Sequence, residues 1–175
     1  MKTADEEYNE SQQALIHDLV SALLSDQIIQ RQKAREQLVE IGGPAVDYLA
    51  RSFKTRNKAL RWEIMKTLVQ IADKRSLHLF INSLEDKNTD IRWLAAEGLI
   101  KLGHISLKPL LKDLIERPNS IFLKEGVHHV LHDVIRKSDL QETFTPILAE
   151  LKETDDDEKV AVLAWTLLKN LEGRI

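Results

Sequence analysis

The sequence contains no cysteine. This absence excludes disulfide bonds, thiolate metal ligands and a cysteine nucleophile, and it fits a reducing compartment. Glycine and proline are also scarce, with six and four among 175 residues. Since 43% of the residues are apolar and 30% are charged, the composition is typical of a helical protein with a real core and unlike that of a disordered chain.

The sequence also lacks the features of a membrane protein and of a nucleic-acid-binding protein. The N-terminal sequence MKTADEEYNESQQ is acidic and polar, whereas a signal peptide is basic and then apolar. No later run reaches the roughly 18 uninterrupted apolar residues of a membrane span. The net charge is −3, whereas duplex-binding proteins need a clustered excess of Lys and Arg. We therefore expect a cytoplasmic protein that binds neither membrane nor nucleic acid.

The central part of the chain contains an internal repeat. The pair Arg61-Trp62 in KALRWEIMKTLVQIA recurs as Arg92-Trp93 in TDIRWLAAEGLIKLG. When the residue before each arginine is numbered position 1, positions 1, 5, 8, 9 and 12 hold apolar or small residues, which form one stripe of an α-helix. These residues are Leu60, Ile64, Thr67, Leu68 and Ile71 in one copy and Ile91, Ala95, Gly98, Leu99 and Leu102 in the other.

The same template fits three further segments. They are LKEGVHHVLHDVI from Leu123, VAVLAWTLLKNL from Val160 and, more weakly, QRQKAREQLVEIG from Gln30. A shorter apolar segment precedes each copy, and breakers such as Gly43-Pro44 separate them. The sequence therefore predicts an all-α fold of about five helix pairs. We expect a flexible acidic arm over residues 1–11 and a single repeat domain over residues 12–175.

This pattern resembles the HEAT-repeat family, most closely the short repeat of the phycobilisome lyases. The likeness covers about residues 12–172, and the segment EIGGPAVDYL is typical of a repeat junction. The best copy, TDIRWLAAEGLIKLG, carries the family pattern at Asp90, Arg92, Ala95, Ala96, Leu99 and Gly103. The resemblance implies a right-handed α-α superhelix, a HEAT-like solenoid whose second helices line a concave face. It also suggests that the position-2 cations, such as Arg92, bind turn carboxylates such as Asp90.

The side of each second helix opposite the core stripe is the candidate working surface. At about 100° per residue, position 3 points away from the stripe, and both Trp62 and Trp93 occupy it. Two aromatic side chains in register within a polar setting are what a binding hot spot requires. The alternative is that one or both rings fold over a neighbouring helix and widen the core. The predicted protein-binding residues are Trp62, Glu63, Lys66, Trp93, Leu94, Glu97, Lys101, His129 and Asp133.

The leading hypothesis is a non-enzymatic scaffold that binds a protein or peptide on this face, with no cofactor. Carboxylates outnumber lysines on it, so a phosphate backbone is repelled. We expect Trp165, at position 6 of the last copy, to close the core instead. The resemblance implies one alternative, an accessory or lyase-like protein for bilin attachment.

Two enzymatic alternatives have less support. The residues Glu97, His129 and Asp133 form a possible metal site, since carboxylates and imidazoles bind zinc or iron. The His-Glu pairs that hold iron in the HEAT-like deoxyhypusine hydroxylases are absent, because their positions read Trp62-Glu63 and Trp93-Leu94. A HEAT-like DNA glycosylase would need a catalytic aspartate on a basic face, and Asp133 lies on an acidic one.

Overall fold

The computed structural model describes residues 4–136, 138–153 and 156–172, and these residues form helices and turns without a strand. The predicted all-α fold is therefore confirmed. The chain divides into two compact units, Met1–Ser76 and Leu77–Ile175. That residues 12–175 form a single repeat domain stays a prediction. Within the described residues, no helix is long and apolar enough to cross a membrane.

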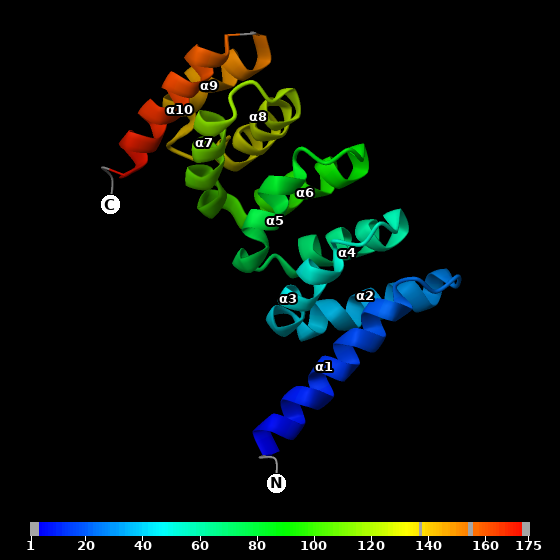
Figure 1. The fold of residues 1–175 in the computed structure, drawn as a ribbon. Coiled ribbons are helices and arrows are strands. Elements are labelled where there is room, and N and C mark those ends of the chain that lie inside the picture. The colour runs from blue at the N-terminus through cyan, green and yellow to red at the C-terminus, as the bar shows by residue number, and fades with distance from the viewer. Residues whose placement is uncertain (1–3, 137, 154–155, 173–175) are drawn as a thin grey trace. The chain divides into compact units, whose positions relative to one another are not determined.

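The first unit contains two helix pairs (Figure 1). Its helices are α1 (Ala4–Ala22), α2 (Ile28–Ile41), α3 (Gly43–Ser52) and α4 (Lys58–Ile71), followed by the short 3-10 helix η1 (Lys74–Ser76). The first helices, α1 and α3, pack against each other, and so do the second helices, α2 and α4. Helix α1 begins inside the segment expected to be a flexible arm, although no side chain from Asn9 to Leu15 is buried.

The second unit contains three helix pairs. Its helices are α5 (Leu77–Ser83), α6 (Thr89–Leu102), α7 (Leu107–Glu116), α8 (Ile121–Ile135), α9 (Gln141–Glu153) and α10 (Asp157–Glu172), with the 3-10 helix η2 (Gly103–Ser106) before α7. The second helices α6 and α8 pack side by side, as α2 and α4 do in the first unit. Within each unit, the described helices thus pack in neighbouring pairs, as in a HEAT-like solenoid.

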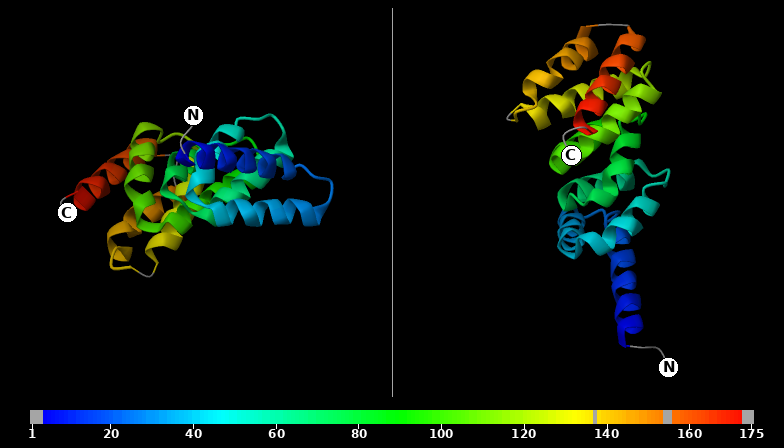
Figure 2. Two further views of the ribbon diagram at one scale, coloured as in Figure 1. Left: turned by 90° about the horizontal axis from the view of Figure 1, so that it is seen from below. Right: turned by 90° about the vertical axis from the view of Figure 1, so that its left-hand side faces the viewer.

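The last helix pair departs from this arrangement. Helix α9 packs against α8, and α10 packs against α7 rather than against α8. Figures 1 and 2 show α10, in red and orange, beside the green α7. Helix α10, although it fits the repeat template, therefore does not pack in the row of second helices. The buried leucines of α7 pack against the apolar stripe of α10 instead. Trp165 is 53% exposed rather than part of the core.

The core follows the repeat template. Positions 5, 8 and 9 are buried in all four helices α4, α6, α8 and α10. These residues are Ile64, Thr67 and Leu68; Ala95, Gly98 and Leu99; Val127, Val130 and Leu131; and Ala164, Leu167 and Leu168. The spacing predicted from the sequence is confirmed by this burial, which supplies the main stabilising free energy of each helix pair.

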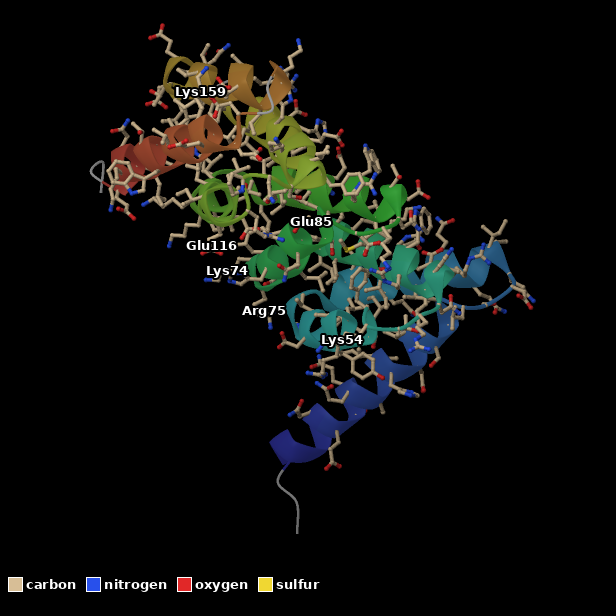
Figure 3. All side chains as sticks on the ribbon, turned by 45° about the horizontal axis from the view of Figure 1, so that its top comes forward. Lys54, Lys74, Arg75, Glu85, Glu116 and Lys159 are labelled. Carbon is tan, nitrogen blue, oxygen red and sulfur yellow. The ribbon has the colours of Figure 1, made fainter. Side chains whose placement is uncertain are left out.

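The turns before the second helices share a local design. The side-chain oxygens of Asn57, Asn88 and Ser120 accept hydrogen bonds from backbone N–H groups in the first turns of α4, α6 and α8. Each cap satisfies a donor that the helix leaves unpaired. The hydroxyl of Ser120 also donates to Glu85, and Arg117 binds Glu85 from the same turn. Glu85 (Figure 3) therefore ties the turn before α8 to the turn before α6.

Two glycines allow α5 and the turn after it to pack closely against the second helices. A Cβ atom on Gly98 of α6 would lie 2.6 Å from the ring of Phe80, and a Cβ on Gly126 of α8 would lie 2.9 Å from Leu84. Both Phe80 and Leu84 are almost completely buried. Such distances are shorter than van der Waals contact, so a larger residue at either position must displace its neighbour.

Replacing Gly98 by Ala should therefore destabilise the protein. An alanine inside a helix normally gains about 1 kcal/mol over glycine, whereas overpacking a core costs about 1–3 kcal/mol. We expect a net loss in the free energy of unfolding, measured by urea denaturation. Lys101→Ala, at an exposed position of the same helix, serves as the control. A more stable Gly98→Ala variant would mean that Phe80 moves aside at no cost.

Candidate functional site

The second helices α6 and α8 enclose a hollow of about 210 Å³ within the second unit. Its lining comes from both helices and from the turn before α6: Leu84, Thr89, Arg92, Trp93, Ala96, Phe122, Glu125, Gly126 and His129. Leu84 and Ala96 are buried, whereas Trp93 and Phe122 are 59% and 45% exposed. The hollow thus has an apolar base and two aromatic rings that solvent can reach.

Arg92 fixes one wall of this hollow. Its guanidinium donates to the carbonyl oxygen of Asp86 at 2.8 Å and to the hydroxyl of Thr89 at 3.1 Å. It also lies 4.0 Å from the ring centroid of Phe122, within the range of a cation–π contact. Arg92 therefore holds Phe122 of α8 against the start of α6.

The position-2 cations differ in what they bind. Arg92 was expected to bind a carboxylate such as Asp90, but it donates hydrogen bonds to the backbone carbonyl of Asp86 and to the Thr89 hydroxyl. Arg31 of α2 likewise donates to the carbonyl of Ser25 at 2.6 Å. Lys124 of α8 binds a carboxylate, that of Asp157 at 2.8 Å, and the Nε atom of Arg31 lies 3.6 Å from the carboxylate of Glu63. A carbonyl six residues earlier lies within reach because the turn folds back onto the first helical residues.

Two residues predicted to face outward are buried. Leu94 is 6% exposed, and Glu63 is also 6% exposed. The carboxylate of Glu63 accepts from Arg35 of α2 at 2.6 Å and lies 3.6 Å from the Nε of Arg31. The expectation of exposure is wrong for both residues. For Glu63 the reason is that position 4 of α4 faces the preceding second helix, α2, which helical periodicity alone does not reveal.

The other predicted binding residues lie in two places. Trp62 and Lys66 belong to the first unit, where both are half-buried and the Lys66 Nζ lies 4.5 Å from the Trp62 ring centroid. Trp62 lines a separate hollow of about 420 Å³ together with Leu24 and Arg31. Lys101 is exposed on α6 of the second unit. That Trp62 and Trp93 form one patch stays a prediction, since each is described within its own unit.

Comparison with known families bears on the central helices. Residues 53–132 match the family model for HEAT repeats. This segment belongs to the HEAT-repeat family. It runs from α4 through most of α8 and so includes the whole hollow.

No curated protein matches the sequence. The family match does not distinguish the phycobilisome-lyase type of HEAT repeat. The role in bilin attachment that this type implied therefore stays a prediction.

The histidines of the HEAT helix α8 form a separate group beside the hollow. The rings of His128 and His132 stack with their centroids 6.4 Å apart. A hydrogen bond of 3.0 Å between His132 and Asp133 lowers the pKa of Asp133. Burial lowers the pKa of His128 below its ordinary value of 6.5, and the charges of His132, Lys152 and His129 add to this effect.

The predicted metal ligands do not come together. The Nε2 atom of His129 lies 3.6 Å from the Glu97 carboxylate, too far for a hydrogen bond, and it is buried without a hydrogen-bond partner. Asp133 pairs with His132 instead. Within the part of the chain that the structure describes, no three His, Cys, Asp or Glu residues are placed to hold a metal ion. The metal site at Glu97, His129 and Asp133 is therefore not formed.

The buried and the exposed carboxylates should respond differently to substitution. Glu63→Gln removes the charge that faces Arg35 in a buried pair, so the free energy of unfolding should fall by roughly 3 kcal/mol. Glu97→Gln, the matched control on the half-exposed side of α6, should cost less than about 1 kcal/mol. Urea denaturation of both variants measures the difference. Equal losses would contradict the structural role of Glu63.

The lowered pKa of His128 should make stability depend on pH. Because the unfolded chain takes up the proton more readily than the folded one, the free energy of unfolding should fall as the pH drops below the ordinary value of 6.5. His128→Asn should reduce this loss. Urea midpoints at about pH 7.5 and about pH 5.5 measure it, and an unchanged slope in the variant would assign the effect to other groups.

Proposed function

We propose that this HEAT-repeat protein is a non-enzymatic scaffold and that it binds a protein segment in the hollow between α6 and α8. The observation that carries the proposal is the exposure of Trp93, at 59%, beside the exposed Phe122. A tryptophan buries a large apolar area on binding and loses little conformational entropy. Residues of this type carry a large share of the energy of protein interfaces.

The size of the hollow favours a protein side chain over a small ligand. Sites for drug-sized molecules typically enclose about 300–1,000 Å³, and this hollow measures about 210 Å³. A volume of this size suits one large side chain of a partner that continues over the helix surface. Because Arg92 already fixes Phe122, little order is lost when the partner binds.

The polar groups of the hollow support a binding role rather than catalysis. The Thr89 hydroxyl accepts a hydrogen bond from Arg92, and no base is recorded beside it within the described residues. His129 has a buried Nε2 atom without a hydrogen-bond partner. A nucleophile needs a base within hydrogen-bond reach, and this hollow offers no such pair among the described residues.

A site-specific crosslink tests the proposal. A photoreactive p-benzoylphenylalanine in place of Trp93 should capture a defined partner from the native cell, which mass spectrometry identifies. With that partner purified, Trp93→Ala should weaken binding roughly tenfold or more, since central aromatic anchors dominate such interfaces. Calorimetry or surface plasmon resonance measures the dissociation constant.

Trp165 provides the matched control. It is exposed to a similar extent, at 53%, but it lies on α10 outside the hollow. A crosslinker at position 165 should not capture the same partner, and Trp165→Ala should leave its affinity within about twofold. Equal capture from both positions, or full affinity of a folded Trp93→Ala variant, would refute the proposed site.

A further inference from the structure

Cations lie beside the aromatic rings of the second helices, with one exception. Lys66 lies 4.5 Å from the ring centroid of Trp62, Arg92 lies 4.0 Å from that of Phe122, and Lys169 lies 6.0 Å from that of Trp165. Among the described residues, no such cation is recorded for Trp93, although it is the most exposed of the three tryptophans.

The sequence explains this exception. Residues four apart on a helix lie on the same face. Lys66 and Lys169 each follow their tryptophan by four residues. In both cases the cation comes from the next turn of the same helix. The residue four positions after Trp93 is Glu97, which has the opposite charge. The residue one turn after Trp93 on the same helix face is therefore a carboxylate rather than a cation.

A second carboxylate lies across the hollow. Glu125 occupies on α8 the position that Trp93 occupies on α6, it is exposed, and no ion pair is recorded for it within the described residues. Among the described residues, the ion pair found for Glu97 is the one with the His129 Nε2 atom, at 3.6 Å. The cation of the hollow, Arg92, already uses its guanidinium on Asp86, Thr89 and Phe122. Glu125 in the hollow and Glu97 beside it thus outnumber Arg92, and this excess of negative charge lies near an exposed ring.

We propose that the Trp93 ring receives the cationic side chain of an arginine or lysine in a basic protein segment, with Glu97 and Glu125 binding its charge. This inference rests on the proposed function, because it names the chemistry of the partner at the same site. The attraction between a cation and an indole ring is strongest among the aromatic side chains. The two carboxylates also attract a positively charged partner, whereas they do not attract a neutral or acidic one.

Short synthetic peptides test the charge requirement. The probe is a nine-residue Gly/Ser peptide with a central Arg-Leu-Arg, and matched peptides carry lysine, or the neutral citrulline, in place of arginine. Binding is followed by the NMR signal of the Trp93 indole N–H. We expect the arginine or the lysine peptide to bind roughly tenfold more tightly than the citrulline peptide. Equal affinity of the charged and neutral peptides would overturn the inference.

A charge reversal tests the ring itself. Glu97→Lys places a lysine four residues after Trp93, as Lys66 follows Trp62, so the protein supplies its own cation. This variant should lose binding of the cationic peptide by roughly tenfold or more. Glu125→Lys should also weaken binding and provides an independent variant. Glu116→Lys, on α7 (Figure 3) and outside the hollow, makes the same change in net charge and should bind normally.

The outcomes separate this inference from the proposed function. An equal loss in Glu116→Lys would attribute binding to net charge and overturn the inference. If a partner is captured at position 93 and the cationic peptides show no preference over citrulline, the scaffold function stands and its partner is not basic. If neither the crosslink nor the peptides engage position 93, both proposals fail.

Discussion

The arrangement of the second unit depends on the contacts that bulky residues of α5 and of the turn after it make with glycines of the second helices. Phe80 and Leu84 are four residues apart, and they pack where Gly98 and Gly126 have no side chain. Because one segment fits against both α6 and α8, it sets the spacing between these two helices. The hollow lies between them, so its width depends on the lack of a side chain at the two glycines. Close packing makes such a contact intolerant of even one added methyl group.

Charged residues have two distinct roles in these helices. Glu63 forms a largely buried pair with Arg35 of α2, and Lys124 of α8 pairs with the partly exposed Asp157 of α10. The value of both pairs lies in fixing the register between helices. Glu125 is exposed and Glu97 is half-exposed. Glu97 has a long contact with His129, and no ion pair of Glu125 is found among the described residues. The number of charged residues on a helix face, counted from the sequence, is therefore a poor guide to binding. Residues in buried ion pairs must first be left out of that number.

The helical period predicted the fold but only part of the candidate site. Positions 5, 8 and 9 could be assigned to the core because they face the helix of the same pair, and the period alone places them there. The exposure of Trp93 was anticipated on the same basis. Position 4 was misassigned at Leu94 and Glu63, and at Glu63 the reason is its contact with the preceding second helix, α2. The place of Trp165 was missed because α10 turns onto α7, a tertiary choice without a local signal. Phe122 was missed because it precedes the repeat template.

The turn of α10 onto α7 has a bearing on self-association. A regular stack presents at its end the same apolar surface that its internal repeats bury, and that surface attracts further copies. Here the leucines of α7 are covered by α10, and α9 presents an exposed side that is mostly polar: Gln141, Glu142, Thr145, Pro146, Ala149 and Lys152. The leucines of α7 are therefore covered within the chain, so less apolar surface is left there for another copy to bind, as a covered edge strand leaves fewer groups for the growth of a β-sheet.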